Sequence, residues 1–366
     1  MTRRLGVVGA LLIAAGGGGD ALAASALHQI LRPTDPAPTV LTYAWERLRV
    51  DPLPGPRGPA GFTALVPVGR FNWQIIPSSD TTPPGRSTLP RLAGQIDARL
   101  LLIDPGGGAA GIRRQVAELV EISAAARVWI VDVGGDAVAH GDEPGLRSPL
   151  ADGLALAACT ALPVPVEILT AGPGLDGELS EAEVVARVAV LGGERLHRLH
   201  RDEVQPLRDH LGWHPTEATA LLTAAALGAR GRVEIRDSGT PVELTDRSAD
   251  IYRVDLPALV AGTRYVASLA ETGTLDQAED VIRRICGASD IDYERAKALR
   301  LSGPRPPRPI EELRRDADAY TAEARANGID YLTFRRLAEA LNTSPDDIAR
   351  LRAHLTVPLW PVRDSR

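Results

Sequence analysis

The chain has 366 residues, of which 44% are hydrophobic and 24% charged, a balance typical of a globular protein with a full core. Its net charge of −6 and its aromatic content of only 4% argue against a basic, base-stacking nucleic-acid surface. Two cysteines exclude a disulfide framework and a four-cysteine zinc site, and the missing G-x-x-x-x-G-K-[ST] sequence excludes a P-loop nucleotidase.

The chain begins with basic residues and an apolar segment, a pattern that resembles a secretory signal peptide. We favour a buried strand over residues 11–15, a glycine turn and a helix over residues 21–31, because four glycines and Asp20 interrupt the apolar run. No other stretch approaches the roughly eighteen apolar residues of a membrane span. We therefore expect a cytoplasmic protein with no membrane partner.

Strand-like apolar runs alternate with helix-like segments in the first half of the chain. The predicted strands cover residues 11–15, 40–44, 100–104, 128–133 and 166–170. The predicted helices cover residues 21–31, 112–126 and 151–161. Continuous apolar strands separated by helices are typical of a mostly parallel sheet with helices on both faces. We therefore predict a Rossmann-like α/β domain over residues 1–301, with ligands bound beyond the carboxyl ends of its strands.

The remaining segments are less regular. Residues 51–90 are rich in proline and glycine, and we expect an ordered loop folded over the sheet edge. A polar helix is expected around His197 and His200, a helix over residues 215–229, and a strand pair at 231–236 and 241–244.

A proline-rich linker at residues 302–309 precedes the C-terminal part of the chain. Beyond it we predict helices over residues 310–326, 331–341 and 345–355, which form a C-terminal helical module spanning residues 310–366. Acidic and basic residues nearly balance there, which favours a packing or dimerising role over DNA binding. A homo-oligomer is therefore one expectation.

A glycine-rich turn follows the first predicted strand: Gly16, Gly17, Gly18 and Gly19. Glycines let a ligand approach the backbone, and the helix that follows offers free N–H groups to an anion. Asp20, at that helix start, is either a cap or faces a cation.

Carboxylates are crowded after the fourth predicted strand. Asp132 lies at the end of that strand, Asp136 follows it, and Asp152 comes after Ser148-Pro149. Neighbouring carboxylates raise one another's pKa unless they bind a cation or share a proton. We predict catalytic roles for Asp20, Asp132, Asp136 and Asp152, with Mg²⁺ held by Asp132 and Asp136; caps and turns are the alternative.

Other polar residues near the predicted strand ends are candidates for substrate binding. Arg47 and Arg57 suit bidentate binding of a carboxylate or phosphate, or equally a structural salt bridge. Together with the first glycine turn, the substrate-binding candidates are Trp45, Glu46, Arg47, Arg57, Ser148, Asp176 and Glu178.

A second glycine-rich turn follows the third predicted strand. Gly106, Gly108 and Gly111 satisfy G-x-G-x-x-G, and Asp132 ends the next strand about twenty residues later. This pattern predicts NAD(P) binding, with a tight structural turn as the alternative.

Several motifs together resemble one known family, catalogued as domain of unknown function 1152, over residues 11 to about 300. They are Ala-Ala-Gly-Gly-Gly-Gly-Asp (14–20), Trp-Glu-Arg (45–47), Asp-Pro-x-Pro-Gly-Pro (51–56), Asp-Val-Gly-Gly-Asp (132–136), Ser-Pro-Leu-Ala-Asp (148–152) and Gly-Pro-Gly-x-Asp-Gly-Glu-Leu (172–179). The resemblance implies no established reaction.

From the residues we expect an enzyme that acts on a small polar or phosphorylated, nucleotide-like metabolite through its strand-end carboxylates, with Mg²⁺. One alternative is an NAD(P)-dependent oxidoreductase that uses Gly106–Gly111. The other is a non-catalytic small-molecule sensor that dimerises through its C-terminal helices.

Overall fold

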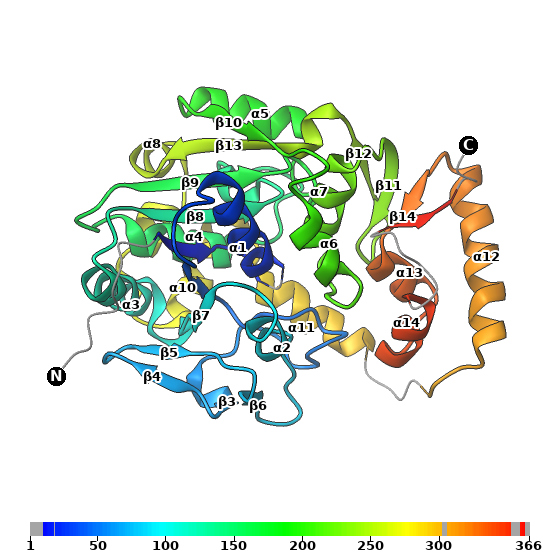
Figure 1. Cartoon of the computed structure of the whole chain (residues 1–366), viewed down its shortest axis with the longest axis horizontal. Helices are drawn as coiled ribbons and strands as arrows, with labels where there is room; N and C mark the ends of the chain where they lie inside the picture. The colour runs from blue at the N-terminus through cyan, green and yellow to red at the C-terminus, as the bar shows by residue number, and fades with distance from the viewer. Residues whose placement is uncertain (1–9, 18, 302–305, 353–358, 363–366) are drawn as a thin grey trace.

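A nine-stranded sheet lies at the centre of the molecule, in the order β10-β13-β9-β8-β1-β2-β7-β5-β4 (Figure 1). The computed structural model of the chain describes residues 10–17, 19–301, 306–352 and 359–362. Five adjacent strands are parallel: β9 (Val166–Ala171), β8 (Val128–Val133), β1 (Leu11–Ala14), β2 (Thr39–Thr42) and β7 (Arg99–Leu102). β1 lies in the middle with β2 and β7 on one side and β8 and β9 on the other, the order of a Rossmann-like fold. The predicted fold class is confirmed.

Both faces of the sheet are buried. Successive side chains of a strand point to opposite faces, so each central strand contributes to two hydrophobic cores. Leu11 and Ile13 of β1 belong to one hydrophobic core, and Leu12 and Ala14 to another. The helices that contribute to the first core are α3 (Gly108–Ser123), α4 (Pro149–Cys159), α5 (Glu181–Val190), α8 (Leu256–Gly262), α9 (Val266–Leu269), α10 (Leu275–Cys286) and α11 (Asp290–Leu301). The second core is formed with α1 (Asp20–Leu31), α2 (Leu89–Ala93), α6 (Gln205–Leu211) and α7 (Ala218–Ala226).

Antiparallel strands extend both edges of the parallel sheet. At one edge, β5 (Asn72–Gln74) pairs with β7 and with β4 (Val66–Val68). The same region contains the small pair β3 (Phe62–Thr63) and β6 (Asp80–Thr81). The segment 51–90 is therefore ordered at the sheet edge, and part of it is a hairpin of the sheet itself.

The other edge corrects one expectation. β13 (Asp250–Asp255) pairs with β9 and with β10 (Glu194–Arg198), so His197 lies on a strand and not on a polar helix. The sequence of β10, Glu-Arg-Leu-His-Arg, has no apolar alternation, because this edge strand contributes no buried side chain to the core. His200 lies just beyond it.

Short 3₁₀ turns complete the main domain. The turns are Pro59–Gly61, Pro105–Gly107, Asp136–Val138 and Asp246–Ala249. No helix in the described ranges is both long and apolar enough to cross a membrane.

The C-terminal module lies at one end of the molecule, with α12 outermost (Figure 1). Its elements are α12 (Ile310–Ala326), β14 (Tyr331–Leu332), α13 (Phe334–Ala340), α14 (Pro345–Arg352) and β15 (Trp360–Pro361). β14 pairs with β11 (Gly231–Ile235), whose hairpin partner is β12 (Thr240–Leu244), so the module shares a four-stranded sheet with the main domain. The helix predicted over 331–341 begins only at Phe334, since the preceding residues form β14.

Candidate functional site

A cavity of about 260 Å³ lies beyond the carboxyl ends of β1 and β8. These neighbouring strands are the point where the strand order reverses, and loops that leave such strands diverge to opposite sides and open a crevice. The loop after β1 supplies Gly16, Gly17, Gly19 and Asp20 to the lining. Gly18, another predicted site residue, lies outside the described residues.

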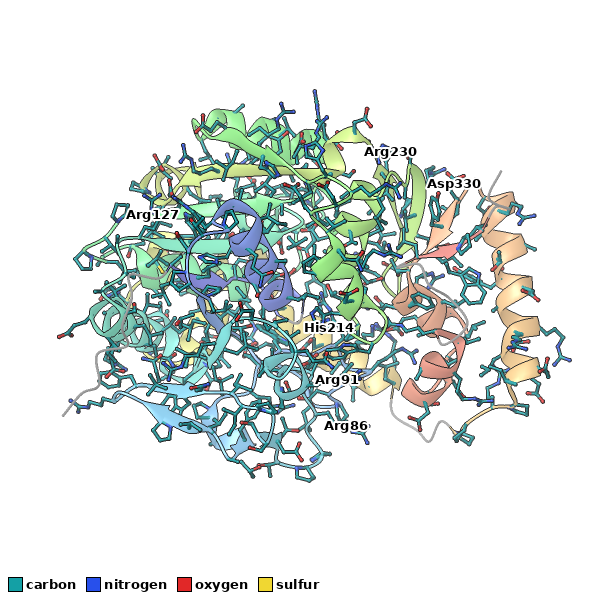
Figure 2. The ribbon with its side chains drawn as sticks, in the orientation of Figure 1. Arg86, Arg91, Arg127, His214, Arg230 and Asp330 are labelled. Atoms are coloured by element: carbon teal, nitrogen blue, oxygen red, sulfur yellow. The ribbon has the colours of Figure 1, made fainter. Side chains whose placement is uncertain are left out.

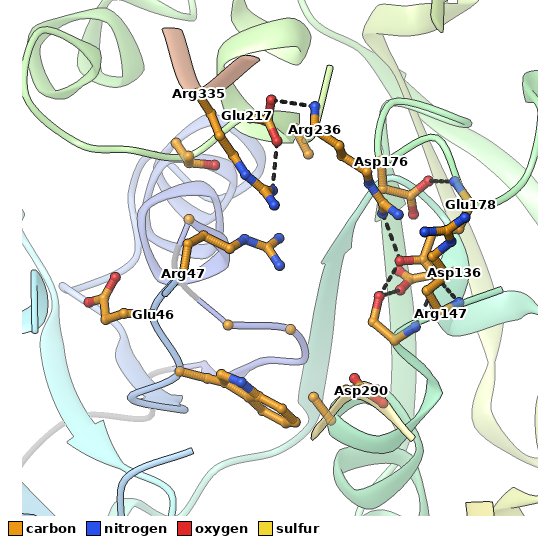
Figure 3. A pocket seen from close by; sticks show the side chains of 18 of the residues that line it. Glu46, Arg47, Asp136, Arg147, Asp176, Glu178, Glu217, Arg236, Asp290 and Arg335 are labelled. Carbon is orange, nitrogen blue, oxygen red and sulfur yellow. Dashed lines mark hydrogen bonds and ion pairs between the residues drawn. The ribbon is translucent and has the colours of Figure 1, made fainter. Parts of the chain in front are cut away.

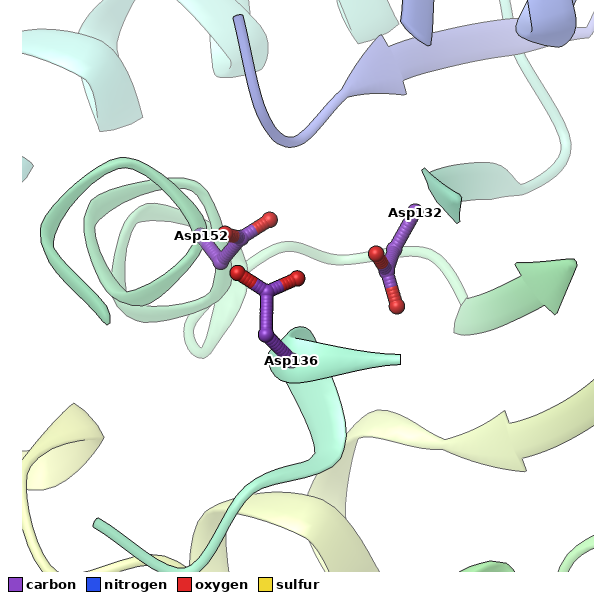
Figure 4. A group of neighbouring side chains, drawn as sticks. All are labelled: Asp132, Asp136 and Asp152. Atoms are coloured by element: carbon purple, nitrogen blue, oxygen red, sulfur yellow. The ribbon is translucent and has the colours of Figure 1, made fainter. Parts of the chain in front are cut away.

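Three buried aspartates converge on this cavity: Asp132, Asp136 and Asp152 (Figure 4). Asp132 comes from the end of β8, Asp136 from the 3₁₀ turn that follows, and Asp152 from the first turn of α4. One carboxylate oxygen of each lies within 4.8 Å of the others. The parallel-strand rule predicted that Asp132 and Asp136 would converge with Asp20, which lines the same cavity, and the structure adds Asp152 from the start of α4.

Two glycines shape the loop between the first two acids. Gly134 and Gly135 have φ angles of 132° and 111°, in the region that favours glycine. A Cβ atom on Gly134 would lie 2.4 Å from Oδ2 of Asp176, a further acid of the cavity. Glycine is therefore required here for the loop after β9 to approach the loop after β8.

Ser148 connects the carboxyl groups of two loops. Its hydroxyl donates to Oδ2 of Asp136 at 2.9 Å and also contacts Oε1 of Glu178. A hydroxyl has one proton to donate, so a proton on one of these carboxyls is needed to satisfy both contacts. Oδ1 of Asp152 is buried and has no hydrogen-bond partner within the described part of the chain. Among the described residues, no cationic side chain forms an ion pair with Asp132, Asp136 or Asp152.

Burial is the main cause of the unusual pKa values in the cluster. It raises the pKa of Asp132, Asp136 and Asp152 well above the ordinary range, and the neighbouring acids raise each of them further. Burial also raises the pKa of Asp20 to about 7, against the lowering effects of the Gly16 N–H group and Arg47.

Glu178 shows the opposite shift. Burial alone would raise its pKa, but Arg236, whose Nη2 lies 2.7 Å from Oε1, and the hydrogen bonds from Ser148 and the Arg147 N–H group lower it below its ordinary value. Glu178 is therefore ionised at neutral pH.

Basic side chains form another wall of the cavity (Figure 3). Arg236 pairs with Glu178, and Arg335 of α13 pairs with Glu217 at 2.7 Å. Arg47 is exposed to solvent and points into the cavity, and its guanidinium makes no hydrogen bond or ion pair with any residue that the structure describes. An unpaired arginine on the wall of a cavity is a binding group for an anion.

The cavity carries an excess of acidic groups. Its lining holds eleven Asp and Glu side chains against six Arg and Lys. Such an excess is stable only if some carboxyls keep their protons or a cation binds among them. The arrangement suits the simultaneous binding of a metal cation and an anionic group.

Residues 11–298 match the model of a family described as protein of unknown function DUF1152. The chain belongs to this family. The match includes the central sheet and the aspartate cluster and ends before the C-terminal module that carries Arg335. No curated protein and no solved structure gives a significant match to the chain.

Three predicted binding residues of this DUF1152 protein have structural partners. Arg57 lies outside the cavity lining and forms a two-pronged salt bridge with Asp51, at 2.7 and 3.1 Å. This is the structural alternative considered for it. Glu46 lies on the lining, but its Oε1 accepts hydrogen bonds from Ser87 and Thr88 at the start of α2. Trp45 also lines the cavity and donates from Nε1 to Glu294 at 2.9 Å.

The second glycine turn of the DUF1152 chain lies away from the cavity. The N–H groups of Ala109 and Ala110, at the start of α3, donate to the side chain and carbonyl of Thr272. A Cβ on Gly108 would lie 2.6 Å from that same carbonyl oxygen. The helix start within the Gly106-x-Gly108-x-x-Gly111 pattern is therefore packed against Thr272, a geometry that disfavours a pyrophosphate site.

Several cavity residues carry no signal that the strand-end rule can detect. Arg236 lies in the β11–β12 hairpin, Asp290 and Lys297 on α11, and Arg335 on α13. Arg147 is the exception, because it directly precedes the Ser148-Pro149 helix start that the sequence indicates. Its guanidinium lies 5.7 Å from the centre of the Tyr293 ring. Its position beside the predicted acids was the one available clue.

Proposed function

We propose that this protein is an enzyme that binds a divalent cation at Asp132, Asp136 and Asp152 and acts on a phosphorylated small molecule held by Arg47. The observation that carries the proposal is the pairing of converging carboxylate oxygens with an unpaired arginine across one cavity.

The aspartate cluster fits a hard cation. Two oxygen ligands of one Mg²⁺ or Ca²⁺ ion are at most about 4 to 5 Å apart, twice the metal–oxygen distance. The three aspartate oxygens lie within 4.8 Å of one another, close enough to share one ion. The partnerless Oδ1 of Asp152 provides a ligand that no protein group uses. A cation here would neutralise phosphate oxygens and favour phosphoryl chemistry.

The chain's own groups would complete the site. Arg47 supplies a two-pronged guanidinium for phosphate oxygens. Asp20, with a pKa of about 7, can hold or accept a proton near neutral pH, as a general acid or base must. The three aspartates are buried, which strengthens their electrostatic interaction with a bound cation.

The oxidoreductase alternative has weaker support. Its glycine turn has no open helix start, because Thr272 already accepts hydrogen bonds from the N–H groups there. No observation specifically favours the sensor alternative, and turnover measurements separate it from an enzyme.

Calorimetric titration of Mg²⁺ and Mn²⁺ into the metal-free protein tests the proposal. We expect Asp136→Asn to weaken cation affinity by at least about 10- to 100-fold, the size of loss typical even for outer-sphere partners of a metal. The same variant should unfold at an equal or higher temperature in EDTA. It removes a buried carboxyl group that lies among other acids and interacts unfavourably with them.

Asp142→Asn is the matched control, because Asp142 is exposed, lies outside the cavity and pairs with His140 at 2.9 Å. Its cation affinity should equal that of the wild type. Phosphate release from a panel of phosphorylated metabolites should be abolished by EDTA. Unchanged cation binding by Asp136→Asn would refute the site.

A further inference from the structure

A second cavity, of about 430 Å³, adjoins the first and shares Arg47, Pro215 and Arg335 with it. It lies between α2, residues 212–215 and the helices α13 and α14 of the C-terminal module. Arg91 and His214, labelled in Figure 2, belong to the main-domain side that faces these helices. Its volume is within the range of small-molecule pockets.

Aromatic rings and arginines line this second cavity. The guanidinium of Arg91 lies 4.0 Å from the ring centre of Trp213, and that of Arg352 lies 4.9 Å from the ring centre of Phe334. Ala338 and Ala349 leave space between these groups. Arginine and aromatic side chains are the ones on which proteins stack nucleobases and other flat rings.

The positive charge of the second cavity is only partly balanced. Arg49 pairs with Glu339 at 2.8 Å, and Arg335 pairs with Glu217. Arg47, Arg91 and Arg352 have no carboxylate partner anywhere in the described ranges. Burial lowers the pKa of Arg352 to about 10, and its Nη1 donates to the carbonyl oxygen of His214 at 3.2 Å.

We infer that the second cavity receives the aromatic ring of a substrate whose phosphate groups extend past Arg47 to the aspartate cluster. The substrate class is an organic phosphate or diphosphate that carries a flat ring, such as a nucleoside diphosphate. The inference rests on the proposed function, which concerns the phosphate groups, and adds the binding site of the ring. Arg47 lines both cavities, which places its guanidinium at the junction of ring and phosphates.

An alkyl chain is a poorer occupant of this space. Alkyl chains bind against aliphatic side chains. This lining instead combines aromatic rings with arginines, which interact favourably with anions and π systems. A stacked base contributes roughly 10- to 100-fold in affinity. That increment is the quantity to measure.

The experiment compares calorimetric affinities, in the presence of Mg²⁺, for inorganic pyrophosphate, for ADP, GDP, CDP and UDP, and for geranyl diphosphate. We expect at least one nucleoside diphosphate to bind about tenfold or more tightly than pyrophosphate. Ala349→Trp, on the exposed side of α14 and facing the cavity, should remove that gain and leave pyrophosphate affinity unchanged. Ala322→Trp, exposed on α12 and outside both cavities, is the matched control and should bind like the wild type.

The outcomes separate this inference from the proposed function. If pyrophosphate binds in an Asp136-dependent way and no nucleotide binds more tightly, the ring subsite is wrong and the metal–phosphate site stands. A nucleotide advantage that survives Ala349→Trp places the ring elsewhere and overturns the inference. Tighter binding of geranyl diphosphate than of any nucleotide overturns the choice of an aromatic ring. If neither pyrophosphate nor any nucleotide binds, both proposals fail.

Discussion

Asp20 illustrates how one residue serves both the fold and the cavity. Its Oδ2 accepts a hydrogen bond from the N–H group of Gly16 at 2.9 Å, so it closes the turn from which α1 begins. Burial raises its pKa to about 7 and that of Asp176 to about 6. Two neighbouring side chains therefore change protonation across the physiological pH range.

These shifts predict a pH-dependent stability. Unfolded, both carboxyls lose their protons near pH 4, whereas the folded protein keeps them until about pH 6 to 7. Their stabilising contribution is therefore complete below pH 4 and is lost as the pH rises through 6 to 7. The free energy of unfolding in EDTA should fall by about 2 kcal/mol or more between pH 5 and pH 8.

Urea unfolding at several pH values measures this slope. Asp20→Asn should flatten it, and added Mg²⁺ should reduce it, because a cation replaces the missing protons. A metal-free protein that is equally stable at pH 5 and pH 8 would contradict the assignment.

At the scale of elements, two glycine-rich turns with similar sequences have different roles. In the turn after β1, a Cβ on Gly17 would lie 2.5 Å from the carbonyl oxygen of Trp45. In the helix start after β7, a Cβ on Gly111 would meet nothing closer than the guanidinium of Arg114, at 3.7 Å. The first turn is tightly packed against Trp45, which lines the cavity. The second turn has room for a methyl group at Gly111.

The two positions should therefore respond differently to alanine. Gly17→Ala should destabilise the protein by about 1–3 kcal/mol, because backbone must shift to admit the methyl group. Gly111→Ala, within α3, should be neutral or stabilise by up to about 1 kcal/mol, since alanine favours the helix. Equilibrium unfolding of both variants tests the pair, and equal stabilities would show that the first turn is not tightly packed.

At the scale of the whole molecule, the C-terminal module is part of the site. β14 adds to the β11–β12 sheet, and Arg335 reaches the first cavity from α13. Glu217 joins the parts: it accepts hydrogen bonds from the Arg236 N–H group, the Thr333 hydroxyl and Arg335. Both cavities therefore depend on how the module packs.

Glu217→Gln should loosen that junction. The variant leaves Arg335 without its charged partner, and we expect a loss of about 2–3 kcal/mol in the free energy of unfolding. Arg335 should also become more exposed to proteolysis after arginine. Glu323→Gln, exposed on α12, is the control and should behave like the wild type in both assays. Wild-type stability of Glu217→Gln would show that the sheet alone holds the module.

Much of the architecture follows from the sequence alone. Apolar runs separated by helical segments predicted the parallel sheet. A strand that is buried on both faces has apolar residues at successive positions, without alternating polar ones. The convergence of Asp20, Asp132 and Asp136 followed from the same pattern, since the carboxyl ends of parallel strands share one edge of a sheet. The sequence did not predict the polar edge strand β10. Its pairing with β13 is made by backbone groups, which leave no apolar pattern in the sequence.

Only the tertiary structure decided which basic residues face the acids. Arg47 and Arg57 both follow β2, yet the pairing of Ala44 with Arg57 directs the latter to Asp51 and leaves Arg47 in the cavity. Arg236 and Arg335 arrive from a hairpin and a module far along the chain. Side chains brought together by long-range packing share no spacing in the sequence. The acids beside the strand ends and Arg47 were therefore predictable, whereas Arg236, Arg335 and the acids of α11 were not.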